Sequence, residues 1–413
     1  MNWNTFDLHV PLDWDRIAAA IPQSEAMRAC IQDEIFHGEG DVFVHTTLVT
    51  EALIADPEFQ DLDETSQRVL VLAAIFHDVA KPATRKEEYD PALGRVRVTH
   101  HGHSNMGARD AWLSLWKSDV PLDIRLRVFA LIAWHQKPFH IFNQKDPRLE
   151  IARFSTVGNW RELIMLARAD NRGRIAPNTE ETDETMQLLR LMCEEEGVLD
   201  GEWSFGNDAA RTAICRKNSD SLFFTPQEPA GSHVIVMSAP PGSGKDTYIT
   251  KMFSGMPVVS MDHLRIDMGV KAEDNQGSVV QAALEQARSH LRKREPFVWN
   301  ATGTSKLMRD KIIALCLGYD AHVAIHALDC PYDTMIKRNR EREARVPEEA
   351  INAMLLKWEP PMAGEAHDVI WIDAITYEAK QRIETAHRVA AELTSGLKNT
   401  VPKNEGSSIP APR

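Results

Sequence analysis

The sequence is short of cysteine, of basic charge and of long apolar runs. Only 5 of its 413 residues are cysteines, and they form neither a CxxC pair nor a zinc-binding spacing. This excludes a disulfide scaffold or a zinc ribbon and predicts reduced, buried thiols in a cytoplasmic protein. No segment offers the roughly 20 consecutive apolar residues of a membrane-spanning helix, and the N-terminus lacks a signal-peptide pattern. We therefore expect no membrane partner.

The charge balance is acidic. Lysine and arginine total 47 against 60 aspartates and glutamates, for a formal net charge of −13. Such a balance argues against extended, non-specific binding of nucleic acid, which usually needs a basic surface. It leaves room for an enzyme that holds only a nucleic-acid terminus, because a few arginines inside a pocket are enough. The length predicts two domains and a connector.

The first half of the chain has helical periodicity. Thr65 and Ser66 are expected to cap a deeply buried helix containing VLVLAAIFHDVAK. Three more apolar segments, SNMGARDAWLSLWKS, DIRLRVFALIAWHQ and WRELIMLARAD, follow it. Because no alternating strand pattern of useful length occurs before about residue 230, this half is predicted to be all-α.

The second half alternates strands and helices. The strand candidates are HVIVMS, PVVS, PFVWN, HVAIHALD and DVIWID, and helical segments separate them. This alternation predicts a multi-domain chain whose C-terminal part is an α/β domain with a parallel sheet. We place a helical domain at 1–176, an ordered, aromatic-containing connector at 177–230, the α/β domain at 231–397, and a disordered Pro/Ser tail at 398–413.

Histidines and aspartates recur near the ends of the predicted helices. The set is His45, His77, Asp78, His103, His135 and Asp170. Imidazole and carboxylate are ligands for divalent metals, and several helices can project them around one centre. Any single one of the 16 histidines is more often a surface or satisfied core residue. The adjacent pair His77 and Asp78 in an apolar helix is costly to bury unless both side chains are used.

These segments resemble the HD phosphohydrolase superfamily. HTTLV, IFHDVAK and ARADNRGR look like its ordered signatures, and HHGHSNMGA resembles the stretch before a further histidine ligand. The resemblance implies that His45, His77, Asp78 and Asp170 bind a first metal. It assigns His103 and His135 to a second metal or to the substrate phosphate, with His100 and His101 as further candidates. Lys81 shares the face of Asp78 and can hold phosphate charge. The ligand types allow Ni²⁺, Co²⁺, Mn²⁺, Cu²⁺ or Fe²⁺.

A phosphate-binding loop opens the second half. In HVIVMSAPPGSGKDTYI, a strand is followed by a glycine-rich turn and a helix start, so backbone N–H groups converge on anionic oxygens. We expect ATP or another NTP with Mg²⁺ to contact Pro241, Gly242, Ser243, Gly244, Lys245, Asp246 and Thr247. Two residues depart from the usual pattern. Ala239 replaces its first glycine, and Asp246 stands where a magnesium-binding Ser or Thr normally follows the lysine.

Two further motifs point to the phosphoryl acceptor. Asp262 and Arg265 lie three apart after a predicted strand, where a carboxylate can accept a hydroxyl proton and an arginine can hold a phosphate. The basic helix MIKRNREREARVP carries Arg338 and Arg342, which suit a lid over the transferring phosphoryl group. The alternative for this helix is a solvated, salt-bridged face.

The second half as a whole resembles 5′-OH polynucleotide kinases. The PPGSGK loop, Asp262-x-x-Arg265, WNATGTSKLMRDK and RNRER occur in that family's order. The resemblance implies that Lys245 binds phosphate, Asp262 is the general base, Arg265 contacts the acceptor's 3′-phosphate, and Arg338 and Arg342 serve the lid. It also implies that Thr302 and Asn300 lie beside the acceptor, while Ala301 departs from an acidic residue of the family.

The order of the two halves resembles bacterial HD-Pnk proteins over roughly residues 20 to 397. The resemblance implies hydrolysis of 2′,3′-cyclic phosphate and terminal phosphomonoester ends by the first domain. It implies phosphorylation of 5′-OH ends of RNA or DNA by the second, with a separate RNA ligase as partner. Three alternatives stay open: an HD nucleotidase fused to a small-molecule kinase, an HD nucleotide sensor regulating the kinase, and an RNA-binding scaffold. The oligomeric state is not indicated.

Overall fold

The computed structural model describes residues 2–5, 11–271, 274–342 and 345–375. These residues form two compact units. The first contains the described chain up to Glu228 together with Thr304–Asp310 and Pro331–Val369. The second contains Pro229–Gly303, Lys311–Cys330 and the described residues from Ile370. The predicted disordered tail lies outside the described residues.

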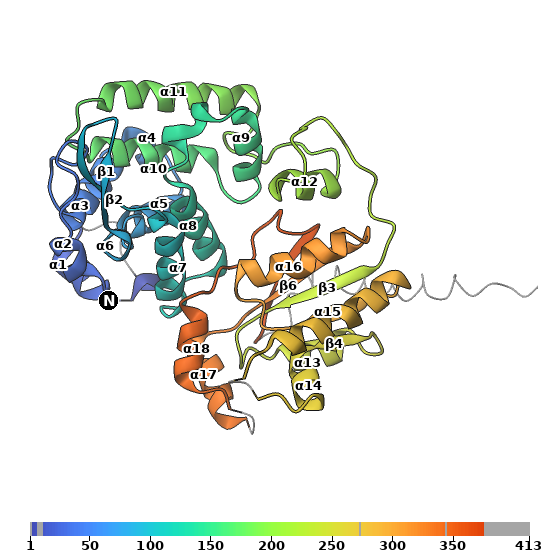
Figure 1. The fold of residues 1–413 in the computed structure, drawn as a ribbon. Coiled ribbons are helices and arrows are strands. Elements are labelled where there is room, and N and C mark those ends of the chain that lie inside the picture. The colour runs from blue at the N-terminus through green and yellow to red at the C-terminus, as the bar shows by residue number, and fades with distance from the viewer. Residues whose placement is uncertain (1, 6–10, 272–273, 343–344, 376–413) are drawn as a thin grey trace, which may run out of the picture. The chain divides into compact units, whose positions relative to one another are not determined.

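The first half of the chain is helical, as the sequence predicts (Figure 1). A short 3-10 helix η1 covers Trp3–Thr5. The helices that follow are α1 Trp14–Ala20, α2 Ser24–Ala29, α3 Val42–Ile54, α4 Pro57–Gln60, α5 Glu64–Phe76, α6 Lys81–Thr84, α7 His103–Trp116, α8 Leu122–Trp134, η2 Pro138–Asn143, α9 Pro147–Ser155, α10 Trp160–Arg172, α11 Thr179–Glu195 and α12 Asp208–Cys215. The three apolar segments of the sequence correspond to α7, α8 and α10.

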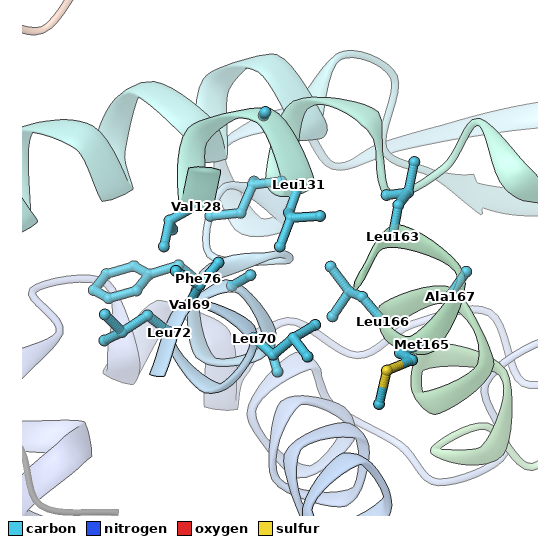
Figure 2. Close-up of a cluster of buried hydrophobic side chains, with 14 of the residues drawn as sticks. Val69, Leu70, Leu72, Phe76, Val128, Leu131, Leu163, Met165, Leu166 and Ala167 are labelled. Atoms are coloured by element: carbon cyan, nitrogen blue, oxygen red, sulfur yellow. The ribbon is translucent and has the colours of Figure 1, made fainter. Parts of the chain in front are cut away.

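The core of this half lies where α5, α8 and α10 meet. Figure 2 shows side chains from all three helices converging, among them Leu70, Leu131 and Leu166, each with no exposed surface. Each fully buried aliphatic side chain of this kind stabilises the fold by about 1.5–3 kcal/mol. This packing fixes the ends of α5, α8 and α10, which carry the candidate site.

The cap of α5 differs from the expectation. Asp63, and not Thr65 or Ser66, is the N-cap, and its carboxylate accepts a hydrogen bond from the Ser66 amide. An aspartate satisfies the free amides of the first turn and favours the positive end of the helix dipole. The helix also ends at Phe76, so His77 is its C-cap residue and does not lie in the helix interior.

A small hairpin interrupts the helices, and the all-α expectation did not include it. It consists of β1 Lys86–Asp90 and β2 Arg95–Thr99, paired antiparallel with Tyr89 opposite Val96. KEEYD has no apolar alternation, because the strand is exposed along most of its length. Its position depends on tertiary contacts such as the two hydrogen bonds from Arg95 to the buried Asp33 carboxylate.

The segment after α11 carries aromatic side chains that contact the helical half. α11 ends before Gly197, whose φ of +71° is the left-handed conformation that favours glycine at a helix end. Trp203 is buried against the core, and the Arg148 guanidinium lies over both its ring and that of Phe223.

The C-terminal half contains a five-stranded sheet among its described residues, with strand order β4-β5-β3-β6-β7. The strands are β3 His233–Ser238, β4 Val258–Ser260, β5 Phe297–Asn300, β6 His322–Asp329 and β7 Asp368–Asp373. The helices are α13 Lys245–Met252, α14 Met261–Asp267, α15 Gly277–Arg292, α16 Lys306–Leu317, α17 Tyr332–Glu341 and α18 Glu348–Leu355. The β3–β5, β3–β6 and β4–β5 pairs are parallel, as the strand–helix alternation predicts.

The segment that carries α17 and α18 packs within the first unit. Trp358 makes edge-to-face contacts with Trp112 and Trp116 of α7, at ring-centroid distances of 5.3 Å and 4.8 Å. Nearby, the buried Arg309 donates two hydrogen bonds to the Glu365 carboxylate at 2.8 Å and 2.9 Å. These contacts attach a late part of the chain to the helical half.

All five cysteines are free thiols, and four of them are buried. None of the helices in the described part of the chain combines the length and apolarity needed to cross a bilayer.

Candidate functional site

Six predicted site residues meet in the helical half. His45 lies on α3, His77 ends α5, His103 begins α7, His135 ends α8 and Asp170 lies on α10. Asp78 directly follows His77, and all six residues are buried. Residues separated by up to 125 positions in the chain thus occupy one cluster.

Asp78 stands at the middle of the cluster. Its Oδ2 lies 3.1 Å from His77 Nε2 and 3.5 Å from His45 Nε2. Its Oδ1 lies 3.3 Å from His103 Nε2 and 3.7 Å from His135 Nε2. One carboxylate therefore has a pair of imidazoles near each of its oxygens, so both oxygens lie among candidate metal ligands.

Asp170 faces the His45 side of the cluster. His45 Nε2 lies 3.1 Å from Asp170 Oδ1. Arg174, one turn further along the chain, donates to both carboxylate oxygens of Asp170. Burial alone raises the pKa of Asp170, but Arg174 and His45 outweigh it and hold the pKa well below its usual value. The carboxylate is therefore ionised and available as an oxygen ligand.

The hydrogen bonds of the ring nitrogens test whether a cation fits. His77, His103 and His135 each place Nδ1 2.7 Å from a backbone carbonyl. A carbonyl only accepts, so each Nδ1 carries hydrogen and each ring directs its Nε2 atom toward the cluster. Burial lowers the pKa of His135 to about 3, so this ring is neutral at pH 7. Several lone pairs and two carboxylates around one buried space suit a divalent metal.

Lys81 contributes a positive charge to the same space. Its Nζ lies 2.7 Å from Asp78 Oδ2 and 2.7 Å from the Gln32 side-chain oxygen. Burial raises the pKa of Asp78, yet His77 and Lys81 outweigh that effect and hold the pKa well below the usual value. The expected proximity of Lys81 to Asp78 is present, one turn along the chain.

His100 and His101, the further candidates for metal ligands, lie outside the cluster. His100 Nδ1 donates to the Lys81 carbonyl, and burial lowers the pKa of His100 to about 4. His101 is exposed and lies 3.4 Å from the Glu88 carboxylate. Neither is among the candidate metal-ligand groups of the described chain.

Sequence reasoning missed four residues that support the cluster. They are Gln32, His37, Glu39 and Arg174. Arg174 was detectable, because it lies at i+4 from Asp170 on one helix face. The other three lie in a loop ahead of α3 without a periodic pattern, so only the tertiary fold reveals their positions.

The phosphate-binding loop follows β3 as predicted. Gly242 and Gly244 have φ angles of +88° and +90°, and Gly244 is the N-cap of α13. The Ala239 amide donates to the Thr302 carbonyl, and Gly303 (φ +56°) lies so close that an added Cβ would stand 2.4 Å from the Met237 carbonyl oxygen. The loop is therefore held between β3 and the turn after β5.

Asp262, Arg265 and Asn300 lie along the same sheet edge. α14 begins directly after β4, and Arg265 Nη2 lies 2.8 Å from Asp262 Oδ1. At the end of β5, Asn300 donates to Asp246 Oδ1 at 2.9 Å. In the strand order β4-β5-β3, the carboxyl ends thus present Asp262, then Asn300, then the phosphate-binding loop.

The predicted lid arginines lie on and just after α17, in the first unit. Arg338 is half-buried on this helix, and the exposed Arg342 is its C-cap residue. Arg340 pairs with Glu348 at 2.8 Å, so one arginine of the RNRER run has the salt-bridged role that the alternative reading described.

The fold and the two sites define a protein in which a helical histidine–aspartate domain precedes a P-loop nucleotide-binding domain. Residues 43–172 match the HD domain family, and residues 234–361 match an AAA domain family. The chain carries an HD domain fused to a C-terminal P-loop kinase-like domain.

Curated proteins with similar sequences include a tRNA nucleotidyltransferase and a multifunctional CCA protein. A CC-adding tRNA nucleotidyltransferase from Thermus thermophilus is 44% identical over 64 residues, which are 16% of this chain and 14% of that protein. A multifunctional CCA protein from Pasteurella multocida is 27% identical over 161 residues, 37% of this chain and 35% of that protein. The chain therefore matches about a third or less of the length of these relatives.

Solved structures that match part of this chain include two kinases. A gluconokinase from Sinorhizobium meliloti is 21% identical with a TM-score of 0.30, covering 43% of this chain and 100% of that one. A putative kinase from Chloroflexus aurantiacus is 16% identical with a TM-score of 0.34, covering 40% of this chain and 98% of that one.

Proposed function

We propose that this protein heals both sides of a broken polynucleotide strand. The HD domain would hydrolyse a 2′,3′-cyclic phosphate and remove the resulting monoester, and the P-loop domain would transfer the γ-phosphate of an NTP to a 5′-OH end. The observation that carries the proposal is the coexistence of two chemically different centres in one chain. One is the His/Asp cluster around Asp78, and the other is the sheet edge with Lys245 and Asp262.

In the HD domain, the residues around Asp78 would hold divalent cations. His45, His77 and Asp170 would complete one position, and His103 with His135 the other. Such cations would activate water and polarise the phosphoryl group. Ni²⁺, Co²⁺, Mn²⁺, Cu²⁺ and Fe²⁺ are all compatible with these ligands.

Lys81 would hold the phosphate end of the substrate. Its ammonium group lies within the cluster at 2.7 Å from Asp78 and neutralises charge that the phosphate brings. In the first hydrolysis, water attacks phosphorus and one ribose oxygen leaves. In the second, another water displaces the remaining ribose oxygen and releases phosphate.

In the kinase domain, the chemistry would rest on position and charge. Lys245 and the backbone amides of the Gly242–Gly244 turn would bind the β- and γ-phosphates. Asp246 and Thr247 would hold Mg²⁺. The 5′-oxygen would attack the γ-phosphorus and give its proton to Asp262, while the β–γ bridging oxygen leaves with the nucleoside diphosphate.

The acceptor would be held by a few groups at the same edge. Arg265 would contact the phosphate on the acceptor nucleotide, and Thr302 and Asn300 would lie beside the acceptor. Arg338 and Arg342, which belong to the first unit, remain the proposed lid arginines. An enzyme that binds only the end of a nucleic acid needs few basic residues, so this proposal agrees with the net charge of −13. The name of one curated relative, a tRNA nucleotidyltransferase, also favours a polynucleotide over a small-molecule substrate.

The test uses an RNA that carries both a 5′-OH and a 2′,3′-cyclic phosphate. The full-length protein is incubated with labelled ATP, Mg²⁺ and each divalent transition metal in turn, and both ends are followed by mass spectrometry. We expect gain of a 5′-phosphate and loss of the cyclic phosphate. Transfer to free nucleosides and not to the RNA would overturn the kinase assignment in favour of a small-molecule kinase. An unchanged 3′ end with every metal would overturn the proposed hydrolysis of the cyclic phosphate by the HD domain.

A further inference from the structure

The imidazoles of the HD cluster are oriented in two different ways. Three rings direct Nδ1 to the backbone carbonyl of the residue three positions earlier, at 2.7 Å in each case. These pairs are His77 with Ala74, His103 with His100, and His135 with Ile132. His45 differs from them, because its Nδ1 lies 2.8 Å from the Oε1 atom of a glutamate, Glu39.

Glu39 is itself held firmly. Its side chain is 1% exposed, and Oε1 also lies 2.8 Å from His37 Nδ1. Its Oε2 accepts a hydrogen bond from the Ile175 amide at 2.9 Å, and the Gly38 amide donates to the Ile175 carbonyl at 2.9 Å. At Gly38 a Cβ would stand 3.1 Å from Ile175, so the two segments approach closely.

These contacts join two elements that carry cluster residues. Glu39 precedes α3, which bears His45, and Ile175 follows α10, which bears Asp170. On the His45–Asp170 side, a buried carboxylate therefore lies behind the His45 ring. On the His103–His135 side, a backbone carbonyl three residues earlier lies behind each ring.

We propose that Glu39 is a positioning residue for His45, which fixes hydrogen on Nδ1 and directs the Nε2 lone pair toward Asp170 and Asp78. This inference rests on the proposed metal centre. A carboxylate behind a ligating imidazole increases its donor strength and fixes its ring orientation, and loss of such a partner typically lowers metal affinity by about 10- to 100-fold. The cation position at His45, His77 and Asp170 is accordingly the tighter of the two.

The experiment compares metal binding by variants of the full-length protein. Protein stripped with a chelator is titrated with Co²⁺ by calorimetry, and bound metal is counted after equilibrium dialysis. The variants are Glu39→Gln, which keeps size and one acceptor, and Glu39→Ala. The matched control is Glu34→Gln, an exposed acid of the same loop. Circular dichroism and thermal melting of the metal-free proteins confirm folding.

We expect two Co²⁺ ions per wild-type chain, one bound more tightly. In Glu39→Gln and Glu39→Ala the tighter step weakens about 10- to 100-fold, while the weaker step and the Glu34→Gln control keep wild-type values. Histidine ¹⁵N-labelled, metal-free protein gives a second reading, since the Nδ1 resonance of His45 should shift in Glu39→Ala when the carboxylate 2.8 Å away is removed.

Three results would overturn the proposal. The first is wild-type affinity for the tighter ion in both Glu39 variants. The second is a third ion in the wild type that Glu39→Ala loses, which would make Glu39 a ligand. The third is the absence of any Co²⁺ binding by the wild type, which would remove the proposed metal centre itself and so differs from the first two.

Discussion

The Nε2 atoms of His103 and His135 lie 3.1 Å apart inside the helical half. Each ring commits its Nδ1 hydrogen to a backbone carbonyl, so the two Nε2 atoms face one another without an acceptor between them. Such a contact is unfavourable in a buried site unless a cation or a proton lies between the nitrogens. The Asp78 Oδ1 atom, 3.3 Å from His103, completes the ligands for a cation there.

We therefore expect His135→Ala to lose one of two bound divalent ions. The His45, His77 and Asp170 position does not use this ring, so its ion should remain. Metal counting after equilibrium dialysis of chelator-stripped protein with Co²⁺ or Mn²⁺ measures the change. His101→Ala is the control, because this exposed histidine lies outside the cluster. Two ions in His135→Ala would contradict a second position at these rings.

The two activities should respond to different substitutions. Asp262→Asn removes the proposed general base and should lower 5′-phosphorylation by about 10²- to 10⁴-fold. Lys245→Ala should abolish phosphorylation, since it removes charge at the transferring phosphate. Hydrolysis of the cyclic phosphate should stay near wild type in both variants, and Asp78→Ala should show the reverse. Loss of both activities in a well-folded Asp262→Asn protein would contradict independent sites.

The buried ion pair of Arg309 and Glu365 should matter for stability. Arg309→Ala leaves a buried carboxylate without its partner, which typically costs about 3–5 kcal/mol. Urea unfolding followed by tryptophan fluorescence measures the loss. Arg292→Ala, at an exposed ion pair with Glu285, should leave unfolding unchanged. The double replacement Arg309→Met with Glu365→Leu should regain much of the stability, because no charge remains buried. A double variant as unstable as Arg309→Ala would argue against this explanation.

The stability of the P-loop domain should depend on pH through His326. This buried residue of β6 lies 2.8 Å from the Tyr248 hydroxyl, and burial lowers its pKa to about 4. Near pH 7 the ring is neutral in both the folded and the unfolded chain. Between about pH 6.5 and 4 only the unfolded chain takes up the proton, so stability falls as the pH falls, by roughly 3 kcal/mol in total.

The measurement is the difference in melting temperature between pH 7 and pH 5. It should be smaller in His326→Gln than in the wild type, while Tyr248→Phe should keep the wild-type difference because it retains the histidine. An equal difference in wild type and His326→Gln would show that the ring does not carry this pH dependence.

Local patterns determined much of what the sequence predicted correctly. The apolar periodicity of α7, α8 and α10, the strand–helix alternation and the glycine-lysine loop are all set by neighbours in the chain, so they can be recognised without a fold. The HD and P-loop domains follow from these motifs. The hairpin of β1 and β2 and the Asp63 cap escaped prediction, because an exposed strand has no hydrophobic pattern and several polar residues near Asp63 are able to cap.

Only the tertiary structure decided how the site is assembled. The sequence names His45 and Asp170, but their 3.1 Å separation depends on the packing of α3 against α10. The same holds for the partners behind the ring nitrogens: carbonyls for three histidines and Glu39 for the fourth. Hydrogen bonds between distant segments depend on distances of a few tenths of an ångström, which residue identity and spacing do not encode. Which side chains are chemically active is a local property, whereas which of them act together is decided by packing.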